Sequence, residues 1–232
     1  MRLVLFDIDG TLVDAKGAGR WAIDQAFERT FGLAGVDSRR SGVRFNGRTD
    51  PSIIDEIAQR NGVAATLLVE RRTALETRYL QLLEERLASG PPARALPGVV
   101  DLVAALEADE VPFGLLTGNI RRGAELKLRA IGIERRFVDG AFGSDGPDRS
   151  ALGRLARERF EARAGSAIDP AEVVVVGDAP EDIRAARANG YRCLAVATGW
   201  CCLGELEALE PDHLLGDLSA TESVMEWLRR GG

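Results

Sequence analysis

Residues 2–12 read RLVLFDIDGTL, in which a short apolar run ends at two aspartates that lie one residue apart. The run from Leu3 to Phe6 is apolar throughout, which predicts a strand buried on both faces. Alternate residues of an extended chain project to the same side, so Asp7 and Asp9 are expected to point together from the end of this strand. Neighbouring carboxylates repel each other unless a cation or a shared proton offsets their charge. The pair therefore indicates a divalent metal, acid–base chemistry or both, although an Asp-x-Asp-Gly run is also common in solvated turns.

The composition is ordinary for a soluble globular protein. With 232 residues, of which 45% are hydrophobic and 28% charged, the chain fits one large domain or a domain that carries an insert. The formal net charge of −6 argues against a nucleic-acid partner, which usually requires a basic surface. No apolar run reaches the roughly 18 residues of a membrane-spanning helix, and the N-terminal run is too short for a signal peptide. We expect a cytoplasmic protein, monomeric or homodimeric, with no membrane or nucleic-acid partner.

Cysteine and histidine are scarce. The three cysteines, Cys193, Cys201 and Cys202, form an odd set in a chain without a secretion signal, which indicates reduced thiols. The single histidine, His213, is too little for a zinc cluster or a Ser-His-Asp arrangement. A redox or metal role for the adjacent Cys201 and Cys202 stays open beside the simpler interpretation of a buried or loop position.

Residues 15–91 carry helical patterns and no strong strand pattern. Helices are expected over 15–31, from Pro51 to about Asn61, and over 65–88, because apolar residues recur there at helical spacing. Asp50 is placed to cap the second of these helices, whose first turn suits Pro51. The run Ser-Gly-Pro-Pro at 89–92 then breaks the chain.

From Gly98 onward, expected strands alternate with expected helices. The strands fall at 111–116, 137–142, 173–176, 193–196 and 213–215, and the helices at 99–107, 120–131, 150–164, 181–188, 203–209 and from 219 onward. This alternation predicts an α/β fold with a doubly wound, Rossmann-like parallel sheet. The insert between the first two strands is far longer than an ordinary crossover. We therefore predict a core domain from residues 1–14 and 92–232, with an all-helical cap domain from residues 15–91.

Small polar residues follow three of the expected strands. The carboxyl ends of parallel strands meet at one edge of a sheet, so these side chains are expected to form one site. The residues concerned are Asp7 and Asp9, Thr117 and Asn119, and Asp178 and Asp182, with Arg149 at the start of a nearby helix.

In these motifs the chain resembles the haloacid dehalogenase-like hydrolase superfamily, in its branch of phosphoglycolate phosphatase-like enzymes. That family carries Asp-x-Asp-Gly-Thr, a Thr or Ser after the second strand, a Lys or Arg, and Gly-Asp-x-x-x-Asp. The matching stretches here are Asp7–Thr11, Thr117, Arg149 and Gly177–Asp182. The resemblance covers the whole chain, including a helical cap between the first two motifs.

The resemblance implies a Mg²⁺-dependent phosphatase that acts on a small phosphorylated substrate through an aspartyl-phosphate. Asp7 would be the nucleophile. Asp9 would protonate the leaving group and then take a proton from the attacking water. Asp7, the backbone carbonyl of Asp9, and Asp178 would hold Mg²⁺, with Asp182 in or just behind this set of ligands.

Phosphate binding would fall, by the same resemblance, to the loop after the second core strand. Thr117 and the amides of Gly118 and Asn119 lie before a helix, where backbone N–H groups bind phosphate oxygens well. Arg149 would offset the negative charge on the nucleophile and the phosphoryl group.

The basic residue departs from the family, whose members usually have Lys, often followed by Pro. An Arg keeps the charge, so Arg149 is a plausible replacement. Lys127 and Arg154 are alternatives, although Lys127 falls within a predicted helix and Arg154 lies one turn deeper in the next one.

The cap is expected to select the substrate. The loop 42–50 is predicted to face the active site, and Arg48 is hypothesised to contact an anionic or hydroxylated part of the substrate, the alternative being a surface arginine. By resemblance, Asp9 favours phosphate esters over the substrates of dehalogenases and phosphonatases, and a hinge without histidine disfavours a phosphomutase. A phosphomutase and a catalytically silent binding protein of the same fold remain the alternatives.

Overall fold

The computed structural model describes residues 2–230, and its centre is a parallel sheet of six strands in the order β5-β4-β1-β6-β7-β8. In the middle, β1 (Leu3–Phe6) pairs with β4 (Phe113–Leu116) on one side and with β6 (Val173–Gly177) on the other. The outer strands are β5 (Gly140–Ala141), β7 (Arg192–Val196) and β8 (His213–Leu215). The predicted α/β class and parallel sheet are confirmed.

Two hydrophobic clusters cover the two faces of this sheet. Val4 and Phe6 point into one cluster, with side chains of α4 (Val99–Ala108), α5 (Arg121–Ala130) and α9 (Thr221–Arg230). Leu3 and Leu5 point into the other, with side chains of α6 (Arg149–Ala164), α7 (Pro180–Ala188) and α8 (Leu203–Glu207). Because both faces are buried, the central strands consist of uninterrupted apolar residues. The sheet is doubly wound, as predicted.

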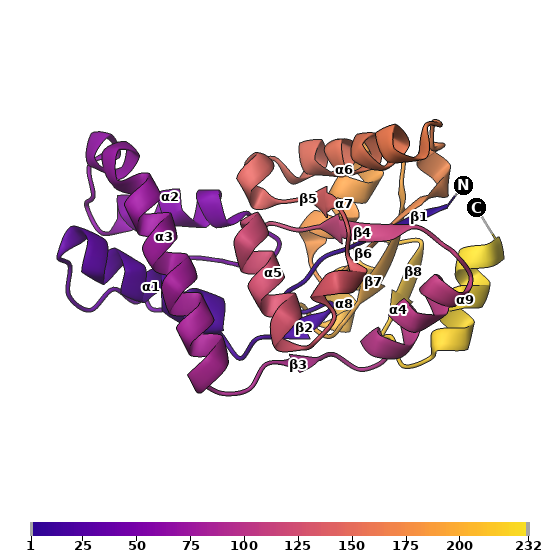
Figure 1. Cartoon of the computed structure of the whole chain (residues 1–232), viewed down its shortest axis with the longest axis horizontal. Coiled ribbons are helices and arrows are strands. Elements are labelled where there is room, and N and C mark those ends of the chain that lie inside the picture. The colour runs from indigo at the N-terminus through magenta and orange to yellow at the C-terminus, as the bar shows by residue number, and fades with distance from the viewer. Residues whose placement is uncertain (1, 231–232) are drawn as a thin grey trace.

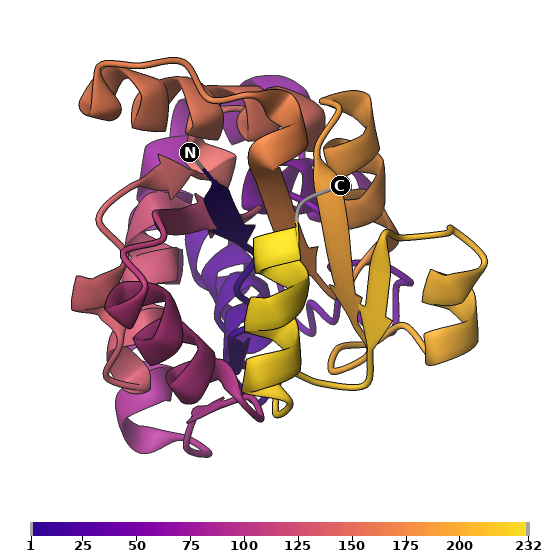
Figure 2. The same ribbon diagram turned by 90° about the vertical axis from the view of Figure 1, so that its right-hand side faces the viewer.

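The first three helices of the chain lie together at one end of the molecule, opposite α4 and α9 (Figure 1). They are α1 (Ala18–Phe31), α2 (Asp50–Arg60) and α3 (Ala65–Ser89). The long α3 packs against α1 and also reaches α5 of the sheet layer. Figure 2, viewed from the opposite end, shows these helices behind the sheet. We call residues 15–91 the inserted segment.

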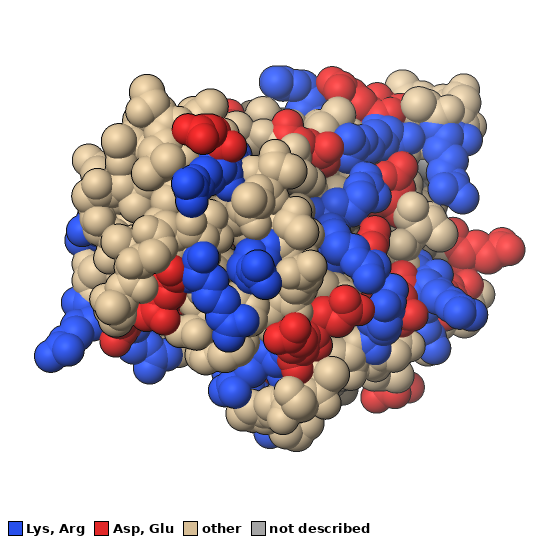
Figure 3. Space-filling view, turned by 60° about the vertical axis from the view of Figure 1, so that its left-hand side comes forward, with Lys and Arg blue, Asp and Glu red and all other residues tan. Residues whose placement is uncertain are grey.

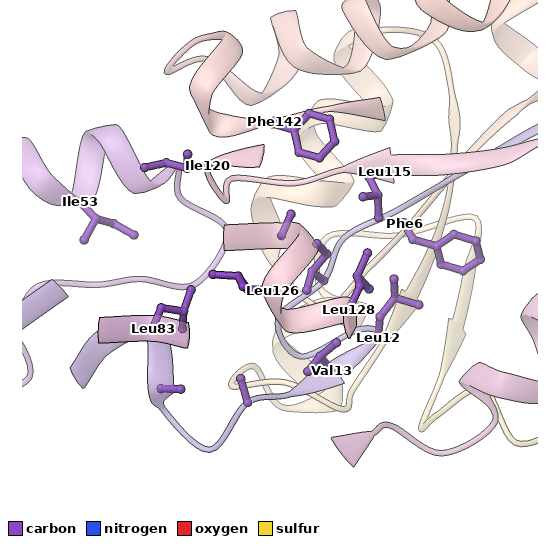
Figure 4. Close-up of a cluster of buried hydrophobic side chains, with 14 of the residues drawn as sticks. Phe6, Leu12, Val13, Ile53, Leu83, Leu115, Ile120, Leu126, Leu128 and Phe142 are labelled. Carbon is purple, nitrogen blue, oxygen red and sulfur yellow. The ribbon is translucent and has the colours of Figure 1, made fainter. Parts of the chain in front are cut away.

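Apolar packing is continuous between the inserted segment and the sheet. Figure 4 shows side chains running from Phe6 and Leu115 at the sheet, through Leu128 of α5, to Leu83 and Ile53 of the inserted helices. All five are less than 5% exposed. The helix α5 is therefore held from both sides.

A second, two-stranded sheet joins the two points where the chain enters and leaves the inserted segment. Here β2 (Val13–Asp14) pairs antiparallel with β3 (Arg94–Ala95). The guanidinium of Arg94 also lies 3.2 Å from the carboxylate of Asp14. The sequence analysis did not predict this pair, because strands of two residues show no periodicity.

The largest difference from the predicted elements concerns residues 137–142. Only Gly140 and Ala141 form a strand, since this edge pairs with β4 alone. Phe137 instead follows the 3-10 turn Glu134–Arg136 and places its ring edge-on to Phe6 and Phe113, with centroids 6.1 and 5.2 Å away. The apolar residue that suggested a longer strand therefore packs into an aromatic cluster. Further 3-10 turns span Gly143–Asp145 and Pro170–Glu172.

The surface mixes both signs of charge. Figure 3 shows Lys and Arg interspersed with Asp and Glu on the face that it presents. Exposed pairs of this kind contribute little stability individually. Within residues 2–230, no helix combines the length and the apolar character that crossing a membrane requires.

Candidate active site

Strand register brings the predicted site residues to one edge of the sheet. Phe6, the last residue of β1, is aligned with Leu115 of β4 and Val176 of β6. The residues that follow each strand, among them Asp7 and Asp178, therefore emerge side by side. The amide of Asp7 continues the ladder with a 2.9 Å hydrogen bond to the carbonyl of Val176. This edge faces the inserted segment (Figure 1).

Three carboxylates form a cluster at this edge. Asp7, Asp178 and Asp182 each place an oxygen within 4.8 Å of the other two, and all three side chains are buried. Asp182 lies in the first turn of α7, where its Oδ2 accepts a 3.0 Å hydrogen bond from the amide of Ala179. Thr11 donates a 3.2 Å hydrogen bond to Oδ1 of Asp178.

The cluster suits a divalent cation. Burial raises the pKa of Asp178 well above its ordinary value, and the negative charges of Asp7 and Asp182 raise it further. The Oδ2 atom of Asp178 is buried and has no hydrogen-bond partner among the described residues. Carboxylate oxygens are the ligands that Mg²⁺ prefers. An ion there would offset the repulsion and give Asp178 Oδ2 a partner.

Two glycines leave room beside Asp178. A Cβ atom on Gly10, whose φ is +84°, would lie 2.5 Å from Asp178 Oδ2, and one on Gly199 would lie 1.7 Å from the same atom. Any larger residue would displace the carboxylate. The absence of a Cβ atom at both positions therefore lets the Asp178 carboxylate pack closely against the backbone there.

Arg149 is the basic residue of the carboxylate cluster. It is the first residue of α6 and 7% exposed, and its Nη2 lies 3.0 Å from Oδ1 of Asp7 and 2.5 Å from Oδ1 of Asp182. Burial lowers the pKa of Arg149, but Asp182 and Asp7 raise it by more, so the net shift is upward. Arg154, one of the alternatives, is exposed and lies 3.9 Å from Glu158 on the same helix. Its position is remote from the carboxylates because it faces away from the sheet.

Lys127, the other alternative, is a second basic residue of the site. Its ammonium lies 2.5 Å from Oδ2 of Asp9 and 2.5 Å from Oδ1 of Asn119. Asn119 Nδ2 donates a further 2.9 Å hydrogen bond to Asp9 Oδ2. The side chain of Asp9 is thus outside the carboxylate cluster, and only its backbone carbonyl remains a predicted metal ligand. A signal for Lys127 was present in the sequence, because it falls on the apolar stripe of its helix with Ala124 and Leu128.

The loop after β4 contacts the inserted segment directly. Gly118 accepts a 2.7 Å hydrogen bond from the amide of Asp50, and the carboxylate of Asp50 accepts a 2.9 Å hydrogen bond from the amide of Ile120. Thr117 Oγ1 accepts a 2.8 Å hydrogen bond from Asn119 Nδ2. The amide of Gly118 has no acceptor within residues 2–230 and is free for a ligand. The predicted capping role of Asp50 is wrong: Thr49 caps α2, because Asp50 is already in its first turn.

Asp50 should make the stability of the protein depend on pH. Burial raises its pKa to about 6, despite the opposing charge of Lys127. The folded protein then retains a proton that the unfolded chain loses near the ordinary pKa of 3.8, so stability falls as pH rises between these values. Asp50→Asn removes this titration. The difference in unfolding free energy, variant minus wild type, should therefore rise by about 2 kcal/mol from about pH 4 to about pH 8. Urea denaturation without Mg²⁺ measures it. A pH-independent difference would contradict this.

A cavity of about 350 Å³ lies between the sheet edge and the inserted segment. Carboxylates from the sheet side and cations from the inserted segment both line it, including Asp7, Asp9, Lys16, Arg20, Arg39 and Arg48. Phe45 to Arg48 of the loop 42–50 also form part of its wall, where the sequence placed this loop. Lys127 and Arg149 also line the sheet side, so positively charged groups lie at both ends of the cavity.

The arginines of this wall differ in how they are held. Arg48 binds Glu56 and donates a 2.9 Å hydrogen bond to the carbonyl of Ser52, so its guanidinium is neutralised within the inserted segment. Arg39 lies 5.6 Å from the ring of Trp200 and has no carboxylate within 4 Å among the described residues. Burial lowers the pKa of Arg20; the negative charge of Asp24 opposes this, and the positive charge of Arg39 adds to it. Among the described residues, Arg39 is the cation of the cavity wall with the fewest protein partners, and the sequence analysis did not single it out.

Comparison with known proteins gives one family. The sequence model of the haloacid dehalogenase-like hydrolases matches residues 1–190. A phosphoglycolate phosphatase from Synechococcus elongatus is 32% identical over 222 residues, which cover 93% of this chain and 92% of that protein. A validoxylamine A 7'-phosphate phosphatase from Streptomyces hygroscopicus is 28% identical and covers 94% of both chains.

A solved structure shows the same fold. CbbY from Rhodobacter sphaeroides, in complex with phosphate, superposes with a TM-score of 0.76 at 20% identity. The match covers 94% of this chain and 95% of CbbY. At this identity the likeness concerns the fold alone.

Proposed function

The chain belongs to the haloacid dehalogenase-like hydrolase family, and from this premise we propose that it is a Mg²⁺-dependent phosphatase acting on a small phosphorylated metabolite. The carboxylate cluster beside Asp7 is the observation that supports this function most directly, because it joins a nucleophile to oxygen ligands for a cation. Asp9, on the cavity side, adds an acid near the same point. The names of the relatives above support phosphate esters as the substrate class.

The first step would transfer the phosphoryl group to Asp7. Arg149 contacts Oδ1 of Asp7, which leaves Oδ2 to attack phosphorus. As this bond forms, the bond to the leaving oxygen breaks, and Asp9 gives that oxygen a proton. When bound by Asp7, Asp178 and Asp182, Mg²⁺ supplies positive charge that offsets the repulsion between carboxylate and phosphate.

The second step would release phosphate. Asp9, now ionised, takes a proton from a water molecule that attacks phosphorus, and the bond to Asp7 breaks. The free amide of Gly118, with Thr117 and Asn119, would hold the phosphoryl oxygens through both steps. Arg149 would keep Asp7 oriented between them.

We further propose that residues 15–91 act as a cap that selects substrates carrying a second anionic group. Arg39 lines the cavity and has no carboxylate partner within residues 2–230, so a substrate anion would be its counter-charge. Arg48 would contribute less, because Glu56 already neutralises it. Phosphoglycolate, named for one relative, has such a second charge in its carboxylate.

A panel of phosphate monoesters tests both proposals. With Mg²⁺, esters that carry a carboxylate or second phosphate should be hydrolysed with lower KM than neutral esters. Arg39→Ala should raise KM for the best anionic ester by about fivefold, the equivalent of roughly 1 kcal/mol for a partly exposed charge pair. KM for p-nitrophenyl phosphate should not change.

Arg40→Ala is the matched control, since Arg40 is exposed and outside the cavity wall. Equal effects of the two substitutions would contradict the role of Arg39. If no ester is hydrolysed, the catalytically silent alternative is favoured, and if phosphate moves within the substrate without release, the mutase alternative is favoured.

A further inference from the structure

Lys127 is a buried lysine whose place in the proposed chemistry is unassigned. It is 3% exposed, and its Nζ contacts two oxygens, those of Asp9 and Asn119, each at 2.5 Å. Burying an ammonium is costly unless its donors are paired, so packing alone does not account for a lysine at this position. An apolar residue would suit the buried stripe of α5 better.

The surrounding packing fixes where the ammonium lies. Helix α5 is held between the sheet and the inserted helices (Figure 4). A Cβ atom on Gly19 of α1 would lie 3.4 Å from Nζ of Lys127 and 4.0 Å from the hydroxyl of Tyr79. The lysine tip therefore fills a confined space beside the inserted segment. Its position does not depend on a flexible surface rotamer.

Two donors converge on one oxygen of Asp9. Lys127 Nζ and Asn119 Nδ2 both bind Oδ2, and no donor from residues 2–230 reaches Oδ1. The side chain of Asp9 is nevertheless 47% exposed and lines the cavity. Oδ2 is thus anchored to the protein, whereas Oδ1 is left without a protein donor within residues 2–230. An exposed carboxylate without such anchors would rotate freely about its side-chain bonds.

On the basis of the phosphatase activity proposed above, we propose that Lys127 is a positioning residue for leaving-group protonation. By holding Oδ2, it directs Oδ1 of Asp9 at the leaving oxygen. As Asp7 bonds to phosphorus, the bond from phosphorus to that oxygen breaks, its electron pair stays on the oxygen, and the proton of Asp9 Oδ1 neutralises it. Lys127 neither gains nor loses a proton in this step.

Asp50 links this arrangement to the inserted segment. It is 6% exposed, and its carboxylate accepts hydrogen bonds from the Ile120 amide at 2.9 Å and from the Tyr79 hydroxyl at 3.3 Å. Its negative charge attracts the positive charge of Lys127. Lys127 therefore lies between an acid of the sheet domain and an acid of the inserted segment, and contacts at that boundary hold it in register with Asp9.

The test compares esters whose leaving groups need protonation to different extents. An alkyl phosphate releases a strongly basic alkoxide, whereas p-nitrophenyl phosphate releases a stable phenolate. Lys127→Met should lower kcat for the alkyl ester by about 10- to 100-fold, a large part of the 10²- to 10⁴-fold that an acid catalyst contributes. It should lower kcat for p-nitrophenyl phosphate by less than about threefold. A residue with a merely structural role would lower both equally.

The controls separate this inference from the proposed function. Arg129→Met lies on the exposed side of the same helix and should change neither rate. Asp9→Asn should reproduce the leaving-group dependence more strongly, and if it lowers both rates equally, the assignment of Asp9 itself fails. If Asp9→Asn behaves as expected but Lys127→Met lowers both rates equally or neither, the role of Lys127 is overturned. If the Met variant does not fold, Lys127→Gln, which keeps an N–H donor, takes its place. It is judged by the same comparison of the kcat losses for the alkyl ester and for p-nitrophenyl phosphate.

Discussion

Asp7→Asn should lower kcat for phosphate release by at least about a thousandfold, because loss of a covalent nucleophile removes most of an enzyme's rate enhancement. The amide is a far poorer nucleophile than the carboxylate. The substitution also removes one negative charge from the cluster with Asp178 and Asp182. Without Mg²⁺, the variant should therefore unfold at the same urea concentration as wild type or a higher one. The rate would fall in a protein that remains folded.

The measurements are initial rates with saturating Mg²⁺ and, in parallel, mass spectrometry of acid-quenched reactions. Phosphorylated Asp7 should be detected in wild type and absent from the variant. Asp55→Asn is the matched control, since Asp55 is an exposed aspartate of α2 that should leave both readouts unchanged. Retained activity in Asp7→Asn would contradict the assignment of Asp7 as the nucleophile. Detection of the phosphoryl group on a different residue would identify that residue as the nucleophile instead.

Asp178→Asn should impair Mg²⁺ use more than folding. Its Oδ2 has no hydrogen-bond partner in the described structure and is therefore the carboxylate oxygen best placed to bind a cation. The substitution removes the negative charge of this ligand. The Mg²⁺ concentration for half-maximal rate should rise by about a hundredfold or more, since even indirect partners of a metal ligand contribute 10- to 100-fold. The rate at saturating Mg²⁺ should also fall.

Thermal unfolding gives a readout independent of activity. Mg²⁺ at 100 times its Kd should stabilise wild type by about 2.7 kcal/mol, or roughly 5–10 °C in Tm for a chain of this size. Asp178→Asn should show little of this shift, whereas Asp169→Asn, an exposed aspartate in a turn, should show all of it. A full Mg²⁺ shift in Asp178→Asn would place the cation elsewhere.

The sheet edge that carries the carboxylate cluster was predictable because strands with both faces buried are uninterrupted apolar runs. Leu3–Phe6 and Val173–Val176 have the pattern of buried strands. The polar residues that follow them lie close together because the carboxyl ends of parallel strands share one edge of the sheet. The alignment of Phe6 with Val176 follows from packing in a parallel sheet. Sequence patterns therefore located the carboxylate cluster correctly.

Side-chain contacts that depend on how helices and loops pack could not be predicted in the same way. The ion pair of Arg48 with Glu56 and the contact of Lys127 with Asp9 depend on how helices pack, which periodicity does not determine. Lys127 was ranked below Arg149 because it falls within a predicted helix. A lysine on the apolar stripe of a helix nevertheless indicates a buried charge with a specific partner. The roles of these residues remain proposals that the substitutions above would test.

The short β2–β3 pair has a consequence for protein engineering. Val13 faces Ala95 and Asp14 faces Arg94, so the chain leaves and re-enters the sheet domain at adjacent points. Joining such neighbours requires only a tight turn, whose closure costs little entropy compared with a long loop. A different helical segment could be grafted between these two strands, provided that it kept the apolar contacts with α5 and the hydrogen bonds to the loop after β4. Under the proposed function, substrate preference and phosphoryl chemistry would then reside in different stretches of the sequence.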